Sequence, residues 1–178
     1  MKNITKFIET KLRLKVNKEK SKVDRPWRVK YLGFSFYQQK ENIEIKVHSK
    51  SITKFKEKIR VITSRSNAMS METRYKKLKQ TIVGWVNYFK IANMKSIVLK
   101  LDEWIRRRIR MCYWKQWKKI RTKHDNLVKL GIEKYKAWQF ANTRKSYWRI
   151  SNSPILDKSL DNKTLERLGY TSLSSVYC

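Results

Sequence analysis

Acidic residues are scarce in this chain of 178 residues. The 14 Asp and Glu residues stand against 44 Lys and Arg residues, which gives a formal net charge of +30 at pH 7. Ordinary soluble domains keep a net charge of roughly 2–8 units, because a larger excess destabilises the fold through self-repulsion unless a polyanion neutralises it. The imbalance argues against most small-molecule enzymes and predicts nucleic acid as the partner.

Cysteine and histidine are also rare. Cys112, Cys178, His48 and His124 are spread along the chain without a Cys-x-x-Cys or zinc-ligand pattern. We therefore expect no metal site, no disulfide and no cofactor. Cys112 falls within an apolar helical stripe and is expected to be a buried small hydrophobic residue.

Patterns typical of catalysis are missing as well. The chain has no glycine-rich phosphate loop, and its five aspartates are never adjacent, so no carboxylate pair that could hold Mg²⁺ is visible. Asp102 and Glu103 are the only neighbouring acids, and we expect a structural ion pair with Arg106 or Arg107 one turn further on. The sequence predicts no catalytic residues, and we expect that the chain is not an enzyme by itself.

Long apolar runs are absent too. No run approaches the roughly 18–20 residues of a membrane-spanning helix, and no signal-peptide core follows Met1, so we expect a cytoplasmic protein without a membrane partner. Four Gly and two Pro leave little turn material for a sheet-rich fold. By contrast, seven Trp, nine Tyr and six Phe exclude a disordered basic tail, so a folded, mainly α-helical chain is favoured.

The N-terminal part mixes two periodicities. Apolar spacing predicts a short helix over residues 3–14, and β-rich and alternating patterns predict strands over residues 29–37 and 43–47. The polar residues 38–42 between the strands are expected to link them as a hairpin. We therefore expect a helix and a β-hairpin ahead of the helical part.

From residue 49 the pattern is helical almost to the end. Ser49 or Ser51 is the candidate N-cap of a first helix, and Ser70 that of a second helix that continues to about residue 92. A third helix begins near residue 93 and either continues to residue 130, where Gly131 can end it, or breaks near residue 122. Shorter helices are expected over residues 132–142, 144–151 and 163–168, the last capped by Asp161 or Asn162.

The third helix has two distinct faces when each residue is turned by about 100°. The half centred on Leu101 is apolar and is expected to face a core: Ile97, Val98, Trp104, Ile105, Ile109 and Cys112. The opposite half carries Arg106, Arg107, Arg110, Trp114, Trp117 and Lys118. Because guanidinium groups bind phosphates and indole rings stack on unpaired bases, this half predicts an RNA-binding surface. Alternatively, the two Trp side chains pack beneath the following helices.

Other basic residues are predicted to bind RNA, because few acidic residues accompany them to form neutralising pairs. They are Lys76, Lys77, Lys79, Lys119, Arg121, Lys123, Arg144, Lys145 and Arg149. A charge run is otherwise a solvated face. Arg108 and Lys115 point toward the apolar half of the third helix, and we expect them to extend along its edge into solvent.

Four blocks of residues, in this order and spacing, closely resemble the C-terminal part of bacterial group II intron reverse transcriptases. They are Arg25-Pro26-Trp27 with Tyr31-Leu32-Gly33-Phe34, then Gly84-Trp85-Val86-Asn87-Tyr88-Phe89, then Leu101-Asp102-Glu103-Trp104-Ile105-Arg106-Arg107-Arg108-Ile109-Arg110, and Ala141-Asn142-Thr143-Arg144-Lys145-Ser146-Tyr147-Trp148-Arg149. The resemblance covers nearly the whole chain.

The resemblance implies a domain organisation. In that family such a stretch comprises the end of the palm, a helical thumb and a maturase-specific region. Carried over, this gives a palm remnant with a helix and a hairpin over residues 1–48, thumb helices over 49–93, and a maturase-specific helical region over 94–178. The Leu32-Gly33-Phe34 block matches the strand leading out of the palm, and the block from Gly84 to Phe89 matches the thumb. Both are expected to be architectural.

The resemblance also implies a function. The family's maturase region binds the intron RNA and helps it fold for splicing, so the implied role is an RNA-binding maturase module that also serves intron mobility in a full-length protein. The family's Tyr-x-Asp-Asp carboxylates lie upstream of where this chain starts, and a zinc-associated endonuclease domain is absent. We therefore expect a fragment or a truncated reading frame.

Two alternatives belong to other classes. The chain could be the thumb half of a split reverse transcriptase that binds a template–primer duplex or target DNA beside a separate palm. It could instead be a decayed fragment that binds nucleic acid only non-specifically.

Overall fold

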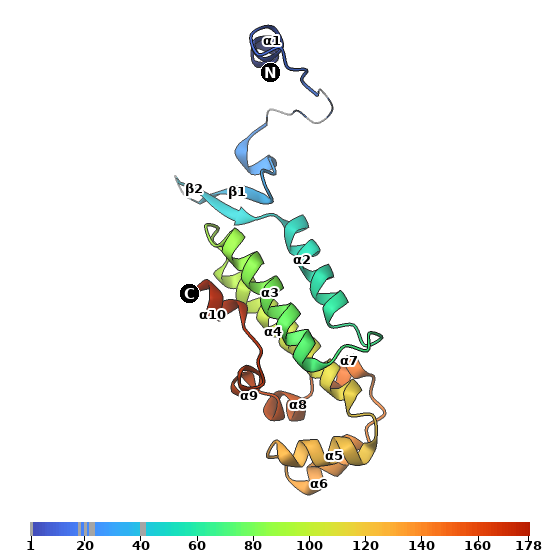
Figure 1. Cartoon of the computed structure of the whole chain (residues 1–178). Helices are drawn as coiled ribbons and strands as arrows, with labels where there is room; N and C mark the ends of the chain where they lie inside the picture. Colours follow the sequence, from blue (N-terminus) through green and yellow to red (C-terminus); the bar gives the residue numbers. More distant parts are fainter. Residues whose placement is uncertain (1, 18, 20, 22–23, 40–41) are drawn as a thin grey trace.

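The computed structural model describes residues 2–17, 19, 21, 24–39 and 42–178, and it is mainly α-helical. A two-stranded antiparallel hairpin precedes the long helices, as the sequence predicts (Figure 1). The N-terminal helix α1 (Lys2–Thr10) buries none of its residues. The expected hairpin link includes residues 40 and 41, which lie outside the described residues.

The hairpin pairs β1 (Phe34–Gln39) with β2 (Asn42–Val47), in a register that places Phe34 opposite Val47. The first strand begins five residues later than predicted. A short 3₁₀ turn, η1 (Pro26–Arg28), comes first, and Leu32 and Gly33 then adopt positive φ angles of 47° and 87°, which extended backbone does not allow. Only glycine fits well at the second of these positions, because a Cβ atom there would lie 2.9 Å from the Ser51 hydroxyl.

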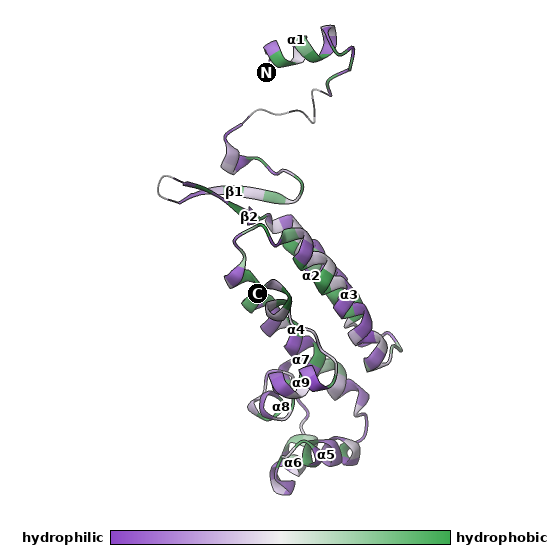
Figure 2. Ribbon diagram, turned by 60° about the vertical axis from the view of Figure 1, so that its left-hand side comes forward, coloured by the Kyte–Doolittle hydropathy of each residue, from purple (hydrophilic) through white to green (hydrophobic). Residues whose placement is uncertain are grey.

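Three long helices form the body of the molecule: α2 (Ser49–Ile62), α3 (Met71–Phe89) and α4 (Lys95–Gln116). The hydroxyl of Ser70 accepts a hydrogen bond from the Thr73 amide, which confirms the predicted cap of α3. The cap predicted for α2 is wrong, because His48, not a serine, accepts from the Lys50 amide. Figure 2 shows apolar and hydrophilic residues interleaved along α2 and α3, as expected of helices with one buried face.

The block around Leu32-Gly33-Phe34 and the block from Gly84 to Phe89 meet where the hairpin packs against the end of α3. The hydroxyl of Tyr88 donates to the Leu32 carbonyl at 2.9 Å. The ring of Phe34 lies edge-on to that of Phe89, with 5.0 Å between centroids, and Trp85 lies nearby against the same ring. These aromatic contacts fix the hairpin on the end of α3.

Helix α4 ends earlier than both ends that the sequence predicts, residue 130 or a break near residue 122. Helix α4 ends at Gln116, and α5 (Ile120–Lys129) begins after a three-residue break. Gly131 ends α5 with a φ of 85°, as predicted. Five short helices follow: α6 (Lys134–Ala141), α7 (Tyr147–Ile150), α8 (Pro154–Ser159), α9 (Asn162–Arg167) and α10 (Leu173–Tyr177). The Asp161 cap of α9 is confirmed, whereas the sequence did not predict α10.

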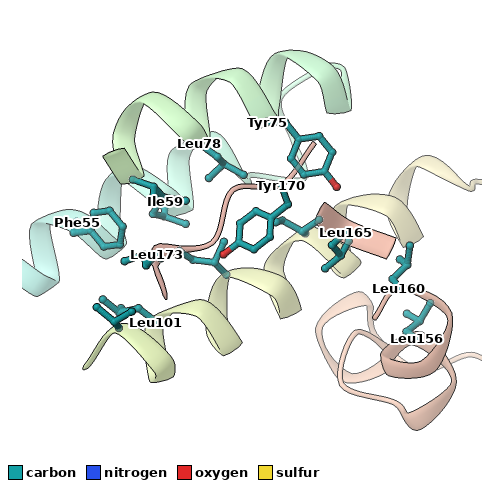
Figure 3. Packing of buried hydrophobic residues seen from close by; sticks show 14 of the residues in the cluster. Phe55, Ile59, Tyr75, Leu78, Leu101, Leu156, Leu160, Leu165, Tyr170 and Leu173 are labelled. Atoms are coloured by element: carbon teal, nitrogen blue, oxygen red, sulfur yellow. The ribbon is translucent and has the colours of Figure 1, made fainter. Parts of the chain in front are cut away.

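The core lies between α2, α3, α4 and the C-terminal segment. Figure 3 shows Tyr170 between α3 and α4, with Leu173 beside it. The predicted apolar half of α4 is confirmed, because Leu101, Ile105 and Ile109 are buried. The C-terminal segment therefore lies between α3 and α4 and adds Tyr170 and Leu173 to the core.

Asp102 holds this segment in place, contrary to the ion pair expected for it. Its side chain is 1 % exposed, and one carboxylate oxygen accepts from the Tyr170 hydroxyl at 2.8 Å and from the Leu173 amide at 2.7 Å. The other oxygen accepts from the amide and the hydroxyl of Ser174, at 2.9 and 2.7 Å. The negative charge thus sits at the start of α10, where amide N–H groups are free to donate.

We predict that Asp102→Asn destabilises the protein by about 2–4 kcal/mol, because the amide nitrogen of Asn faces at least one donor that then stays buried and unsatisfied. The matched control is Glu103→Gln, since Glu103 is exposed. Urea unfolding followed by circular dichroism measures both changes. Equal stability of the two variants would contradict the role assigned to Asp102.

We also predict an acid-side loss of stability through His48. Burial lowers the pKa of this imidazole, and the charges of Lys30, Lys50 and Lys46 act in the same direction. The unfolded state therefore binds the proton more tightly, so the stability is fully present above the usual pKa of about 6.5 and falls as the pH drops below it. His48→Asn keeps a capping side chain without this titration. The unfolding midpoint should therefore differ more between about pH 7.5 and about pH 5 in wild type than in the variant.

Candidate nucleic-acid interface

A basic groove opens where the α2–α3 loop, α4 and the start of α7 meet. It has a volume of about 710 Å³, and its charged lining residues are Arg60, Arg65, Arg108 and Lys115. A smaller hollow of about 300 Å³ shares Arg65 and Lys115 and adds Arg74 and Lys118. We call the two hollows together the basic groove, and among the described residues no acid lines either of them.

Arg74 shapes the loop that forms one wall of the groove. It is buried at the start of α3, and its guanidinium donates to the backbone carbonyls of Ile62, Asn67 and Met69. One side chain thus satisfies the carbonyls at the end of α2 and in the loop that follows. These hydrogen bonds fix the shape of the loop, in which Arg65 is exposed.

The groove cations are not neutralised by acids. None of the ion pairs between residues described in the structure involves any of the six. Arg65 and Lys115 instead approach the ring of Tyr147, at 5.2 and 5.3 Å from its centroid. Burial lowers the pKa of Arg108, and the neighbouring positive charges of Arg60 and Arg65 act in the same direction. An anion in the groove would relieve this repulsion.

Arg108 also links the groove to the end of α2. Its guanidinium donates to the hydroxyl and carbonyl oxygens of Thr63 and to the Arg60 carbonyl. Arg108 and Lys115 were expected to extend along the edge of the apolar half into solvent. Lys115 is exposed, whereas Arg108 is half-buried and its guanidinium is hydrogen-bonded to the end of α2. Their position at the edge makes them part of the groove wall.

Three residues predicted for the RNA-binding face of α4 lie in the interior, so their predicted surface position is wrong. Trp114 is 2 % exposed and Trp117 is 8 % exposed, with their ring centroids 6.0 Å apart. Arg110 is 7 % exposed; it donates to the Leu160 carbonyl at 3.0 Å and pairs with Asp157 at 2.6 Å. The alternative, in which the Trp rings pack beneath the following helices, is the correct one. These three side chains have no free face for a phosphate or a base.

Arg106 and Arg107 lie at the border of this buried region and are half-buried. The Arg107 guanidinium stacks on Trp148 at 3.9 Å from the ring centroid and donates to the Trp148 carbonyl at 3.1 Å. Trp148 itself lines the basic groove. Arg107 therefore stabilises Trp148, which is part of the groove wall.

The other predicted basic residues are accessible, apart from Lys123, which is half-buried over the Trp114 ring at 4.8 Å. The exposed ones are Lys76, Lys77, Lys79, Lys118, Lys119, Arg121, Arg144, Lys145 and Arg149. Of these, only Lys118 lines the basic groove. Sequence reasoning missed Arg60 and Arg65, because Arg60 is one cation among many on α2 and Arg65 lies in a loop without periodicity.

Comparison with protein families gives one match, and it covers these same elements. Residues 52–131 match the family described as "Group II intron, maturase-specific domain". This part of the chain is therefore similar to a group II intron maturase-specific domain. The match runs from α2 through α5 and so includes the helix ends and the loop that carry Arg60, Arg65, Arg108 and Lys115. The resemblance drawn from the sequence is confirmed. Comparison with curated proteins gives no match.

The described residues lack two further features. No described helix is long and apolar enough to span a membrane. No group of three or more His, Cys, Asp or Glu side chains is placed to hold a metal ion in the part of the chain that the structure describes.

We predict that Arg110→Gln and Arg106→Gln separate the two kinds of arginine on α4. Arg110→Gln leaves the buried Leu160 carbonyl and Asp157 without their cation, and should cost about 2–4 kcal/mol of stability. Arg106→Gln should cost less than about 0.5 kcal/mol, because Arg106 is a half-buried residue without such partners among those described. Urea denaturation measures both, and equal losses would contradict the assignment.

Proposed function

We propose that this chain is an RNA-binding maturase module that binds group II intron RNA, stabilises its folded form and so promotes splicing. The observation that carries the proposal is the basic groove within the matched maturase-specific domain. The excess of 30 positive charges and the match to that domain support the same partner. The RNA supplies the splicing chemistry, and the protein contributes positioning and charge neutralisation.

The groove suits a folded RNA backbone. The cations of its larger hollow come from the end of α2, the α2–α3 loop and α4, so a phosphate backbone that enters it contacts three elements at once. Arg60, Arg65 and Lys115 hold their charges at the wall without acidic partners, and each can exchange solvent for a phosphate oxygen. Lys76, Lys77, Lys79 and the other exposed cations named above extend the positive field beyond the groove.

We extend the proposal to the domain organisation implied by the resemblance: a palm remnant over residues 1–48, thumb helices over 49–93 and maturase-specific helices over 94–178. Large apolar residues in the first part are exposed, among them Phe7, Trp27 and Tyr31. Exposed apolar residues of this kind support association with a separate reverse-transcriptase palm. In a full-length protein the module would then also serve intron mobility, with a template–primer duplex or target DNA as further ligands.

The test is binding and splicing with a group II intron RNA. We predict that Arg65→Gln/Lys115→Gln weakens binding and lowers the slope of log K against log salt by about 0.7–0.9 for each lost phosphate contact. The splicing rate at limiting protein should fall with it. The matched control is Lys163→Gln/Arg167→Gln, which removes the same charge from exposed positions on α9.

Three results would contradict the proposal. One is equal loss of affinity in the groove variant and the α9 control, since the groove would then be no more than part of a general positive field. Another is equal affinity for an unrelated structured RNA of the same length. The third is preferential binding of an RNA–DNA hybrid without any effect on splicing, which would favour the thumb of a split polymerase.

A further inference from the structure

Helices α5 and α6 form a hairpin that lies beyond the end of α4, away from the β-hairpin (Figure 1). Its two helices pack on each other through Leu127, Ile132 and Ala137, all of which are buried. Gly131 lies at the turn between them. The helix pair therefore presents an outer face that the body of the molecule does not cover.

Two aromatic side chains stand on this outer face. Tyr135 and Trp138 are three residues apart on α6, which places them side by side on one face of the helix. Tyr135 is 80 % exposed and Trp138 is 45 % exposed. On its inner side, Trp138 stacks on His124 of α5 with 4.2 Å between ring centroids and 23° between planes. We call His124, Trp138 and Tyr135 together the aromatic step.

The surroundings of the aromatic step are strongly positive. Residues 119–145 contain eight Lys and Arg residues and only two acids. Both acids already have partners, because Asp125 lies 2.8 Å from the His124 ring nitrogen and Glu133 lies 2.9 Å from the Lys136 ammonium. Tyr135 is flanked along the chain by Lys134 and Lys136. A ligand of this face must therefore combine negative charge with flat rings.

We propose that the aromatic step binds unpaired nucleotides, with one base stacked on the exposed ring of Tyr135, beside Trp138, and the adjoining phosphates against the neighbouring lysines. The proposal rests on the proposed function in taking RNA as the partner. It goes beyond the basic groove, because it assigns a second contact to a different element and a different chemistry. In a duplex the ring faces of the bases are covered by their neighbours, so only single-stranded or looped RNA offers them.

A protein partner fits this face less well. Exposed aromatic residues that dock on proteins are commonly surrounded by further apolar residues and depleted of lysine. Here two lysines flank Tyr135 along the chain, and most cations of the segment have no acidic partner among the described residues. Charge complementarity favours a polyanion.

The test uses the full chain and a fluorescein-labelled oligo(U) of about 12 nucleotides. The reference ligands are an abasic oligonucleotide of equal length, which keeps the phosphates and lacks the bases, and a blunt RNA duplex. Wild type should bind oligo(U) about 5- to 150-fold more tightly than the abasic strand. Tyr135→Ala should reduce that preference strongly and leave the affinity for the duplex unchanged.

Two matched variants separate ring stacking from other effects. Tyr135→Phe keeps the ring and should keep the preference for oligo(U), whereas Tyr135→Leu keeps an apolar side chain and should lose it. Retention of the preference in Tyr135→Ala or Tyr135→Leu would overturn the proposal, and so would an equal loss of affinity for all three ligands. A change in oligomeric state of Tyr135→Ala would indicate a protein interface instead and would overturn it too.

The outcome is distinguishable from a failure of the proposed function. Intron binding through the basic groove does not require Tyr135, so a failed aromatic step leaves the effect of Arg65→Gln/Lys115→Gln on splicing intact. Conversely, a chain that binds oligo(U) through Tyr135 and has no effect on splicing would contradict the maturase role alone.

Discussion

The structure depends on two charged side chains of α4 that are buried on its second face. Asp102 holds the start of α10 through four hydrogen bonds, and Arg110 holds the end of α8 through the Leu160 carbonyl and Asp157. Because α10 packs on both α3 and α4, these contacts tie α4 to the rest of the core. At the edge of α4, Arg108 and Lys115 meet the α2–α3 loop and form part of the basic groove.

The buried contacts of α4 also affect which charges stay available at the surface. Four of the 14 acids serve the fold: Asp102 and Asp157 anchor the C-terminal segment, Asp161 caps α9, and Glu72 lies in the first turn of α3. The other ten are too few to neutralise 44 Lys and Arg residues. The folded protein thus keeps most of its positive charge available, and a bound RNA contributes the counter-charge that the sequence lacks.

Much of the fold is predictable because it is encoded locally. The Ser70 and Asp161 caps, the Gly131 terminus and the strand alternation each depend on a few neighbouring residues. The second face of α4 was not predictable in this way. A helical wheel separates apolar from basic residues, but it does not reveal that short, weakly periodic helices more than forty residues later cover the basic side around Arg110.

The candidate site shows the same limit. Phosphate-binding cations were expected on the regular helix, whereas the groove takes Arg65 from a loop whose shape depends on hydrogen bonds from Arg74 to three carbonyls. Lys115 is exposed as expected, whereas Arg108 turns to the end of α2, and the proximity of both residues to the loop depends on tertiary structure. The exposed Tyr135 lies outside every resemblance block and has no periodic signal that distinguishes it from a core residue.

Ultraviolet crosslinking of the full chain to a group II intron RNA, with crosslinked peptides identified by mass spectrometry, tests the central claim most directly. We predict crosslinks in peptides that carry the groove walls, around Arg65, Lys115 and Trp148, and their loss in Arg65→Gln/Lys115→Gln. Crosslinks confined to the outer face of α3, at Lys76, Lys77 and Lys79, would contradict the basic groove as the site of RNA binding.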